Sequence, residues 1–421
     1  MAPRSASLPD FTGAFVDEGY LHLVSLLGCG GSAKVYKALD TTSSSDNPAF
    51  FAVKCMKDGP RGSTQAALLS NEIHMHDSVA DHPGVLSFHR VFSEGDCVFV
   101  VFDLGDANML ACVNRQLYVG NPELVKQAFL QLLDVVEDCH QRGMFHRDIK
   151  PQNILCNLAG ADILLADFGG ATRRAESRDF HRGTTGYMSP ECLDTSRASY
   201  SSRGADTWSL AVTLVILATG HMPWTAAEPT NCNYAAFRKD PEHFLHRLLK
   251  LTHEANDIFR WCFHVNPARR PTIAQLRAAV LAAPCFLVAN IPSIIRTAIP
   301  ALVGVAHMHP AVSSASSMTS SATSSTLSSP STAATFSAGP LTPPACSFQP
   351  PIAIVDLLDA ANVGLAALYP EPLKPTKLYG RFIPPPLPSH LKSSPEFRFL
   401  DLKRRGVANR MRFADAQRRT F

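Results

Sequence analysis

The sequence lacks the cysteine patterns of metal-binding and disulfide-stapled proteins. It contains 11 cysteines, but no two of them form a C-x-x-C pair, and none combines with histidine at a zinc-binding spacing. Small disulfide-rich domains and zinc modules depend on such spacings, so neither class is indicated. Unpaired thiols in a reducing compartment are the simpler explanation.

A strong charge of one sign and a long hydrophobic run are also absent. The net charge is only +3, which gives no argument for a nucleic-acid or membrane partner. The longest clean apolar run, Leu210–Ala218, is too short to cross a bilayer, which takes about 20 residues, and we interpret it as a buried core helix. The first residues, MAPRSASLPD, have no cationic start followed by an apolar stretch, so we expect no signal peptide. We expect a protein of the cytoplasm, the nucleus or both.

Hydrophobic periodicity divides most of the chain into two parts. The 421 residues are 46% hydrophobic, enough for two or three structural units. Runs of β-branched and aromatic residues predict a sheet within 15–103, together with one helix near 65–79. In 104–285, apolar residues recur every three or four positions, which predicts helices; the clearest one starts at Asn121 and Pro122, a favourable cap. We therefore predict an α+β fold with two lobes, an N-terminal β-rich lobe (15–103) and a C-terminal helical lobe (104–285).

The composition changes in residues 291–421. Ser313–Thr335 is mostly Ser, Thr and Ala, and cannot bury enough apolar surface to offset the entropy of ordering. We predict a largely disordered Ser/Thr- and Pro-rich tail in which Ile352–Leu368 can form one isolated helix. The stretch Ile383–Pro388, IPPPLP, has the composition of a polyproline ligand for an SH3- or WW-type partner, and the basic run Lys403–Arg405 that of a nuclear signal. A solvated spacer and a solvated chain end remain the alternatives.

A glycine-rich stretch, LGCGGSAKVY, precedes a lysine on a predicted strand. Gly28 and Gly30 have the spacing of a loop that covers nucleotide phosphates, although glycine turns join strands in many folds. Lys54, in FAVKC, can reach phosphate oxygens beneath such a loop; taken alone, it is equally well explained as a solvated lysine. Glu72, on the predicted helix, can pair with Lys54, but glutamate on a helix usually faces solvent.

Two later stretches carry the most specific chemistry. In FHRDIKPQNIL, Asp148 can accept a hydroxyl proton and align the oxygen on a phosphorus atom, while Lys150 can neutralise charge on the transferred group. Asn153 offers a neutral oxygen ligand for a hard cation such as magnesium. In LLADFGGAT, Asp167 ends an apolar strand, where its carboxylate can bind a metal ion that bridges phosphates. Together with the glycine loop and Lys54, these stretches predict a site for phosphoryl transfer.

From about residue 20 to 283, the sequence resembles a eukaryotic protein kinase, in these motifs and in their order. The resemblance implies a bilobal kinase fold, ATP and Mg²⁺ as nucleotide and metal, and proteins as substrates. It implies that Gly28 and Gly30 cover the phosphates, that Val35 and Ala52 enclose the adenine, and that Lys54 pairs with Glu72. It further implies that Asp148 is the catalytic base with Lys150 assisting it, that Asn153 and Asp167 hold magnesium, and that Thr184, Glu191, Asp206 and Arg270 serve substrate docking and structure.

Further residues narrow the resemblance. Lys150 and Thr184 are typical of the serine/threonine class. GTTGYMSPECL, DTWSL, ATGHMPW and HVNPARRPT resemble a fungal group of kinases that is linked to nutrient sensing and to the choice between mitosis and meiosis. The expected function is ATP-dependent phosphorylation of protein serine and threonine hydroxyls in such signalling. The alternatives are a pseudokinase scaffold, whose usual signature is the loss of residues that are present here, and recruitment through the proline-rich tail.

Two departures from the kinase pattern lead to separate expectations. Ala33 stands where a third glycine is usual; it should slow turnover or stiffen the loop, without abolishing binding, unless the position needs a positive φ. Phe180 stands where many relatives carry a phosphorylated residue close to the arginine at position 147. Our hypothesis is that the kinase is active without phosphorylation of this segment, because Asp179 supplies the negative charge or because none is needed. Phosphorylation of Ser177 is the rival hypothesis.

Overall fold

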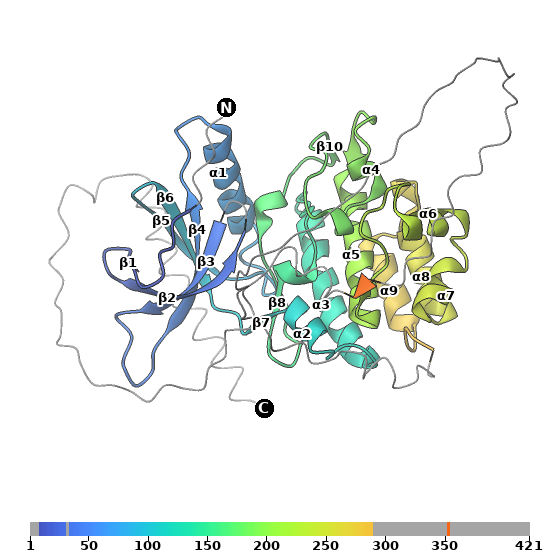
Figure 1. Ribbon diagram of the computed structural model, residues 1–421, viewed down its shortest axis with the longest axis horizontal. Helices are drawn as coiled ribbons and strands as arrows, with labels where there is room; N and C mark the ends of the chain where they lie inside the picture. Colours follow the sequence, from blue (N-terminus) through green and yellow to red (C-terminus); the bar gives the residue numbers. More distant parts are fainter. Residues whose placement is uncertain (1–7, 31–32, 289–351, 354–421) are drawn as a thin grey trace, which may run out of the picture. The chain divides into compact units, whose positions relative to one another are not determined.

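The computed structural model describes residues 8–30, 33–288 and 352–353, which all lie within one compact unit, Met1–Leu368. Its first lobe is a six-stranded antiparallel sheet in the order β1-β2-β3-β4-β6-β5, drawn from blue to teal in Figure 1. The strands are β1 (Phe15–Val16), β2 (Leu21–Cys29), β3 (Ala33–Asp40), β4 (Phe50–Lys57), β5 (Phe88–Glu94) and β6 (Cys97–Asp103), and helix α1 (Thr64–Asp77) follows β4.

The sheet forms because apolar side chains alternate or run continuously along these strands, as predicted. Tyr36, Val53 and Phe99 are buried in its core, and the polar loop between β3 and β4 turns the chain back as a hairpin. The register places Val35 opposite Lys54 and Ala52 opposite Phe102. The central strand β4 therefore holds Lys54 between two apolar neighbouring strands.

The second lobe is mainly helical and is drawn from cyan to yellow in Figure 1. Its helices are α2 (Met109–Asn114), α3 (Pro122–Gln141), α4 (Pro190–Leu193), α5 (Ser202–Thr219), α6 (Cys232–Lys239), α7 (Phe244–Leu249), α8 (His253–Cys262) and α9 (Ile273–Ala282). Short strands lie between them: β7 (Ala107–Asn108), β8 (Ile154–Cys156), β9 (Leu164–Leu165), β10 (Glu176–Ser177), β11 (Tyr200–Ser201) and β12 (His221–Met222).

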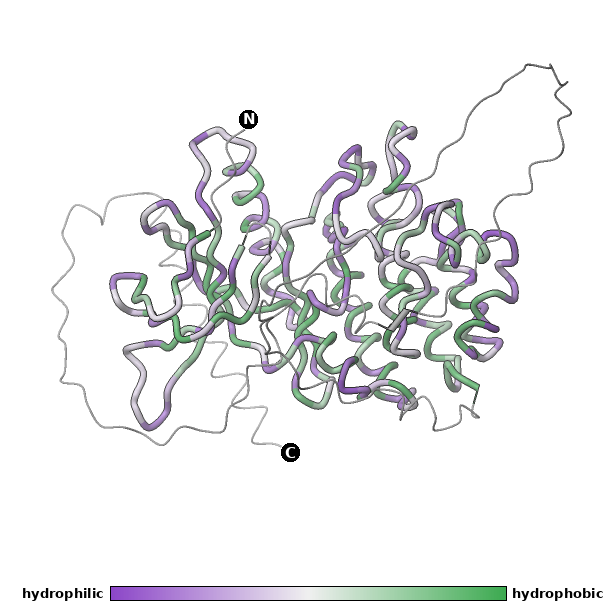
Figure 2. Tube along the Cα trace, in the orientation of Figure 1, coloured by the Kyte–Doolittle hydropathy of each residue, from purple (hydrophilic) through white to green (hydrophobic). Residues whose placement is uncertain are grey.

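Helices α3 and α5 form the centre of this lobe. The predicted cap of α3 is present, since Asn121 Oδ1 accepts a hydrogen bond of 3.2 Å from the Leu124 amide. The apolar run Leu210–Ala218 lies within α5 and is buried, which confirms the prediction of a core helix; hydrophobic residues likewise dominate the core segments in Figure 2. Within the described part of the chain, no helix is long and apolar enough to span a membrane.

The tail prediction is wrong at one point. Ile352 and Ala353 form a strand, β13 (Ile352–Ala353), rather than the start of a helix, and pair with β12 in antiparallel register. The edge of β12 offers backbone groups to pair with, and β-branched isoleucine favours an extended strand. The other tail predictions, for 291–351 and 354–421 including Ile383–Pro388 and Lys403–Arg405, lie outside the described residues.

Candidate active site

A lysine and two carboxylates connect the sheet, α1 and the start of the turn after β9. Lys54 Nζ lies 2.6 Å from Glu72 Oε1 and 2.9 Å from Asp167 Oδ1. Burial disfavours the charged lysine, but the carboxylates of Asp167 and Glu72 outweigh it and raise the pKa of Lys54. Burial likewise works against the ionised form of Asp167, yet Lys54 lowers its pKa to about 2. Both groups therefore carry full charge at neutral pH.

Asp167 occupies a left-handed backbone conformation, with φ of 62°. This region is sparsely populated by residues other than glycine and costs energy. The conformation allows the chain to leave β9 and enter the turn η2 (Phe168–Gly170) while the carboxylate is directed toward Lys54. Backbone strain at Asp167 is compatible with a residue whose carboxylate is needed at this place.

The catalytic-type loop gathers a base, a cation and a hydroxyl. Asp148 Oδ2 accepts from Lys150 Nζ at 2.9 Å, and Asp148 Oδ1 accepts from the hydroxyl of Thr184 at 2.8 Å. Lys150 Nζ also donates to Thr184 Oγ1 at 2.7 Å. The structure thus brings together residues that lie up to 36 positions apart in the sequence.

Asn153 lies between this cluster and Asp167. Its Nδ2 donates to the carbonyl oxygen of Asp148 at 2.9 Å and to Asp148 Oδ2 at 3.1 Å. No described residue donates to Oδ1, so this oxygen is available as a ligand. The carbonyl of Asn153 accepts from the Ala166 amide at 2.9 Å, so Asp167 follows immediately. Asn153 and an ionised Asp167 supply the hard oxygen ligands that Mg²⁺ prefers.

The oxygen ligands of Asn153 and Asp167 suit a metal ion that is bound mainly by the phosphates of a nucleotide. Among the residues that the structure describes, no group of three or more His, Cys, Asp or Glu side chains has the arrangement of a metal site. Mg²⁺ is commonly bound by one or two carboxylates together with substrate phosphates. Asp167 and Asn153 therefore fit magnesium bound with a nucleotide.

The residues predicted to contact the nucleotide lie on strands β2, β3 and β4 or directly after β2. A Cβ added at Gly28 would meet no atom within 4 Å, and one at Gly30 only the Ala33 carbonyl oxygen, at 3.7 Å. A side chain at either position would therefore not clash with the rest of the protein. The open space beside these glycines is compatible with bound phosphates. Ala33 is the first residue of β3 and has no positive φ, so alanine carries no backbone penalty there. Val35 is partly buried and Ala52 is buried, on the neighbouring strands β3 and β4.

Asp206 holds the backbone of the catalytic-type loop (145–155) through hydrogen bonds. It is fully buried at the start of α5, and its carboxylate accepts from the amides of His146 at 2.9 Å and Arg147 at 2.7 Å. A third bond comes from His140 Nε2, at 2.8 Å. Burial opposes ionisation, but these donors outweigh it and lower the pKa of Asp206. Arg147, with φ of 64°, is thereby held in a left-handed conformation next to Asp148.

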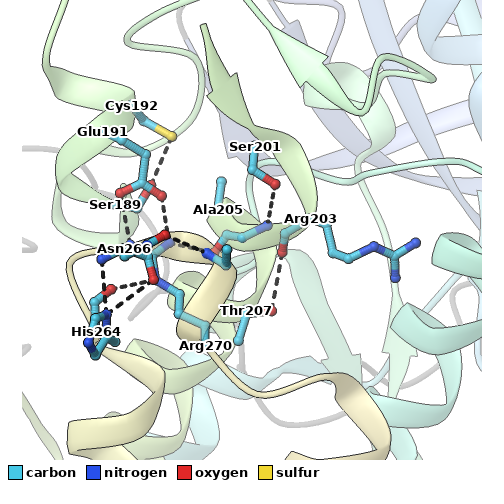
Figure 3. A network of polar contacts seen from close by, with 12 residues as sticks. Ser189, Glu191, Cys192, Ser201, Arg203, Ala205, Thr207, His264, Asn266 and Arg270 are labelled. Carbon is cyan, nitrogen blue, oxygen red and sulfur yellow. Dashed lines mark hydrogen bonds and ion pairs between the residues drawn. The ribbon is translucent and has the colours of Figure 1, made fainter. Parts of the chain in front are cut away.

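Glu191 and Arg270 form an ion pair, which Figure 3 shows together with the neighbouring residues Ser189, His264 and Asn266. Arg270 Nη1 and Nη2 bind Glu191 Oε1 and Oε2 at 2.5 and 2.8 Å, and both side chains are 1% exposed. Arg270 also donates to the carbonyl of Gly204 at 2.8 Å. The pair joins α4 to the start of α5 and to the turn before α9.

Arg147 contacts the segment that follows the turn η2. Its Nη1 donates to Ser177 Oγ at 3.0 Å, to Asp179 Oδ2 at 3.3 Å and to Tyr200 OH at 3.3 Å. Ser177 is only 1% exposed. The ring of Phe180 lies 5.5 Å from that of Tyr200. This segment is therefore held by hydroxyl, carboxylate and aromatic groups of the chain itself.

Sequence reasoning did not predict the side-chain hydrogen bonds that hold the turn η2 and the residue after it. The carbonyls of Gly169, Gly170 and Ala171 accept hydrogen bonds from Arg182, Arg147 and Asn71, respectively. The only sequence signal was the position of Asn71 beside Glu72.

His76, one turn after Glu72 on α1, was also missed. Its Nε2 donates to the Leu86 carbonyl at 2.7 Å. The centroid of its ring lies 4.9 Å from the ring centroid of Phe168 and 5.1 Å from that of Phe102. Burial lowers the pKa of His76 to about 4, so the imidazole is neutral. The i, i+4 spacing from Glu72 predicts the shared helix face, but not the aromatic partners.

The protein kinase domain matches residues 21–281. The "Negative regulator of sexual conjugation and meiosis" of Schizosaccharomyces pombe is 32% identical over 285 residues, covering 62% of this chain and 59% of that protein. The serine/threonine-protein kinase ksp1 of the same yeast is 30% identical, over 55% of this chain and 50% of the relative. The serine/threonine-protein kinase VHS1 of Saccharomyces cerevisiae is 31% identical, over 50% and 48%. The chain thus spans about half of the length of these relatives, or slightly more.

Proposed function

The chain belongs to the protein kinase family, and on that premise we propose that it transfers the γ-phosphoryl group of ATP to serine and threonine hydroxyls of proteins. In this proposal the lobe of residues 15–103 binds the nucleotide, and the lobe of residues 104–285 carries the catalytic and substrate-docking groups. One observation supports it above all: Asp148 accepts a hydrogen bond from a hydroxyl, that of Thr184, at 2.8 Å, while Lys150 lies within 2.9 Å of both groups.

Asp148 is proposed as the base that orients the substrate hydroxyl and accepts its proton. Thr184 already presents a hydroxyl to Oδ1 of this carboxylate, so the orbital that would receive the proton faces a hydroxyl group. Lys150 stabilises negative charge that develops on the transferred group. Asp206 and Asn153 hold the loop in place through its backbone and through Asp148 itself. Catalysis of this kind depends mainly on positioning and on electrostatic stabilisation.

Lys54, oriented by Glu72 and Asp167, is proposed to bind the α- and β-phosphates, beneath Gly28 and Gly30. Val35 and Ala52 provide the apolar surfaces for the adenine. Asn153 and Asp167 would hold Mg²⁺, which when bound neutralises charge on the phosphates. The base, the lysine and the metal-binding aspartate are all present, which argues against a pseudokinase.

A transfer assay tests this proposal. The purified full chain is incubated with Mg²⁺, labelled ATP and a mixed serine/threonine peptide library, beside the variants D148N and K54M. We expect transfer to peptides that is lost in both variants. Binding of ATP without any transfer would overturn the proposal in favour of a non-catalytic scaffold.

The finer role, in the control of meiosis or of nutrient responses, rests on the relatives. One of them is named as a negative regulator of sexual conjugation and meiosis, and we propose a related signalling role for this chain. The test is complementation of a fission-yeast strain that lacks this regulator. Expression of the chain, but not of its D148N variant, should suppress unscheduled meiosis. Equal suppression by D148N would contradict a role through phosphorylation.

A further inference from the structure

Two cysteine thiols meet in the interior of the helical lobe. Sγ of Cys112, on α2, lies 3.5 Å from Sγ of Cys156, on β8, although the two residues are 44 positions apart in the sequence. Both cysteines are free, and both are buried, with exposed fractions of 0% and 3%. The two sulfur atoms are therefore already in contact, with no other side chain between them.

The backbone holds both cysteines in place. Strand β7 pairs with β8 in antiparallel register, with Ala107 opposite Cys156, and α2 begins directly after β7. Sγ of Cys112 also lies 3.9 Å from the carbonyl oxygen of Asn157, the residue after Cys156. Because secondary structure fixes both positions, the sulfur atoms remain neighbours whenever this lobe is folded.

Cys112 differs in acidity from other buried thiols of the chain. A hydrogen bond from Cys156 outweighs the effect of burial and, together with the charge of Arg115, lowers the pKa of Cys112. By contrast, burial raises the pKa of Cys139 and of Cys262 to about 12. The thiolate is the form of cysteine that attacks an oxidant, so Cys112 is more readily oxidised than these two thiols.

The pair lies close to the protein surface. Arg115, three residues after Cys112, donates from Nη1 to the carbonyl of Leu158 at 3.3 Å. Both of these residues are exposed, and Leu158 is only two positions after Cys156. Hydrogen peroxide is little larger than water, so local opening of this surface can admit it, whereas a bulky thiol is excluded.

The neighbouring thiol determines the product of such an oxidation. A cysteine sulfenic acid condenses with a thiol to a disulfide, and Cys156 is the thiol in contact with Cys112. Burial of both sulfur atoms favours this internal reaction over reaction with a thiol from solution. Disulfides of reducing compartments are usually transient and redox-sensing.

We propose that Cys112 and Cys156 form a site of reversible oxidation, at which a peroxide converts the two thiols to a disulfide. The thiolate of Cys112 attacks one peroxide oxygen, the O–O bond breaks, and the hydroxide that leaves takes up the proton that Cys112 released. The thiol of Cys156 then attacks the sulfenic sulfur. The S–S bond forms, the S–O bond breaks, and the proton of Cys156 leaves with the oxygen as water. Two thiols thereby give two electrons to one hydrogen peroxide molecule, which becomes two molecules of water.

The disulfide joins α2 to the strand that follows the proposed magnesium ligand. Cys156 is three residues after Asn153, and β8 lies between β7 and β9, the strand that precedes Asp167. The thiols themselves are separate from the groups proposed for phosphoryl transfer. Their oxidation can therefore be measured without any assay of kinase activity.

Peptide mapping of the full chain tests the proposal. The native protein is treated with stoichiometric hydrogen peroxide, its remaining thiols are blocked with a maleimide during unfolding, and it is digested with trypsin without reduction. Cleavage after arginine releases residues 91–115, which contain Cys112, and residues 148–173, which contain Cys156. We expect these two peptides to be joined with the loss of two hydrogen atoms, and to separate on reduction. Because residues 91–115 also contain Cys97, fragmentation of the joined peptides identifies the linked cysteine.

Serine variants show which thiols react. C112S and C156S should both abolish the joined peptides, and C156S should instead gain oxygen on Cys112. C262S removes a buried thiol on α8 and should give as much joined peptide as the wild type. If a serine variant does not fold, the corresponding alanine variant replaces it.

A charge variant tests the activation of Cys112. R115Q should slow the joining about two- to fivefold, the range of one exposed charge interaction. R197A, in an exposed arginine paired with nearby Asp194, should leave the rate unchanged. Equal rates for R115Q and the wild type would overturn the role of Arg115 in the activation.

The exposed thiol of Cys29 indicates whether the peroxide has acted. Oxidation of Cys29 without any joined peptide in the wild type would overturn the proposal. Linkage through Cys97 in place of Cys112, or joining that occurs only after the protein has been unfolded in denaturant, would overturn it as well.

Discussion

Nη1 of Arg147 lies 3.3 Å from Oδ2 of Asp179, which connects the residue next to Asp148 with the segment that follows η2. The same nitrogen donates to the hydroxyl of Ser177, and Nε of Arg147 donates to the carbonyl of Gly170 at 2.7 Å. Asp179 is thus an anion that the chain itself supplies to this arginine. The geometry supports the hypothesis that the segment needs no added phosphate.

We predict that active enzyme carries no phosphate on Ser177. This hydroxyl is buried and already bonded to Arg147, so a kinase acting on it would first have to open the segment. S177A should keep at least about one fifth of the wild-type kcat/KM, because a single neutral hydrogen bond contributes about 1 kcal/mol. Mass spectrometry and peptide kinetics check both points. Stoichiometric phosphate at Ser177, with activity lost in S177A, would show the hypothesis to be wrong.

Substitution of Glu72 should impair use of ATP. E72Q removes the carboxylate that lies 2.6 Å from Lys54 and leaves Asp167 as its remaining charged partner. Hydrogen bonds between charged groups contribute about 1.5–3 kcal/mol, so kcat/KM for ATP should fall about 10- to 100-fold. The control is E123Q on α3, where the glutamate side chain is 82% exposed. Unchanged ATP kinetics in E72Q would contradict the proposed role of the pair.

The buried pair of Glu191 and Arg270 should contribute far more to stability than a surface pair. R270A leaves Glu191 charged and buried without its partner, and should lower the free energy of unfolding by about 3–5 kcal/mol. R270K should recover only part of this loss, because lysine cannot form the two-pronged contact. R247A removes an exposed partner of Asp240 and should cost less than about 1 kcal/mol. Denaturant titration of the full chain measures each value, and equal costs for R270A and R247A would refute the prediction.

His76 should make the fold sensitive to mild acid. Burial lowers its pKa to about 4, from an ordinary value of 6.5. Between these values the unfolded chain binds more protons than the folded chain, so the free energy of unfolding falls as the pH decreases from 6.5 to 4, and this contribution changes no further below pH 4. The loss amounts to about 3 kcal/mol over this window.

H76L tests this contribution, because leucine fills a similar volume and cannot be protonated. The difference in unfolding free energy between wild type and H76L should change by about this amount from pH 6.5 to 4. H253Q, in an exposed histidine at the start of α8, should leave the wild-type pH profile unchanged. Parallel profiles for wild type and H76L would show that His76 does not control the response.

The sequence by itself determined the parts of this protein that depend on local pattern. Alternating apolar residues predicted the main strands of the sheet, and Asn121 with Pro122 predicted the start of α3, because these signals act within a few residues. The cluster of Asp148, Lys150 and Asn153 was also predictable, since all three lie within one short loop. Because they are close in sequence, their chemical roles can be inferred from the motif before the fold is known.

Only the tertiary structure decided which distant groups meet. Lys54 and Asp167 are 113 residues apart in the chain, and they come together because the sheet and the turn η2 pack on α1. The burial of Ser177 and the aromatic neighbours of His76 are equally invisible to periodicity. Each depends on how complete helices and loops pack, and packing joins side chains whose sequence separation carries no local signal.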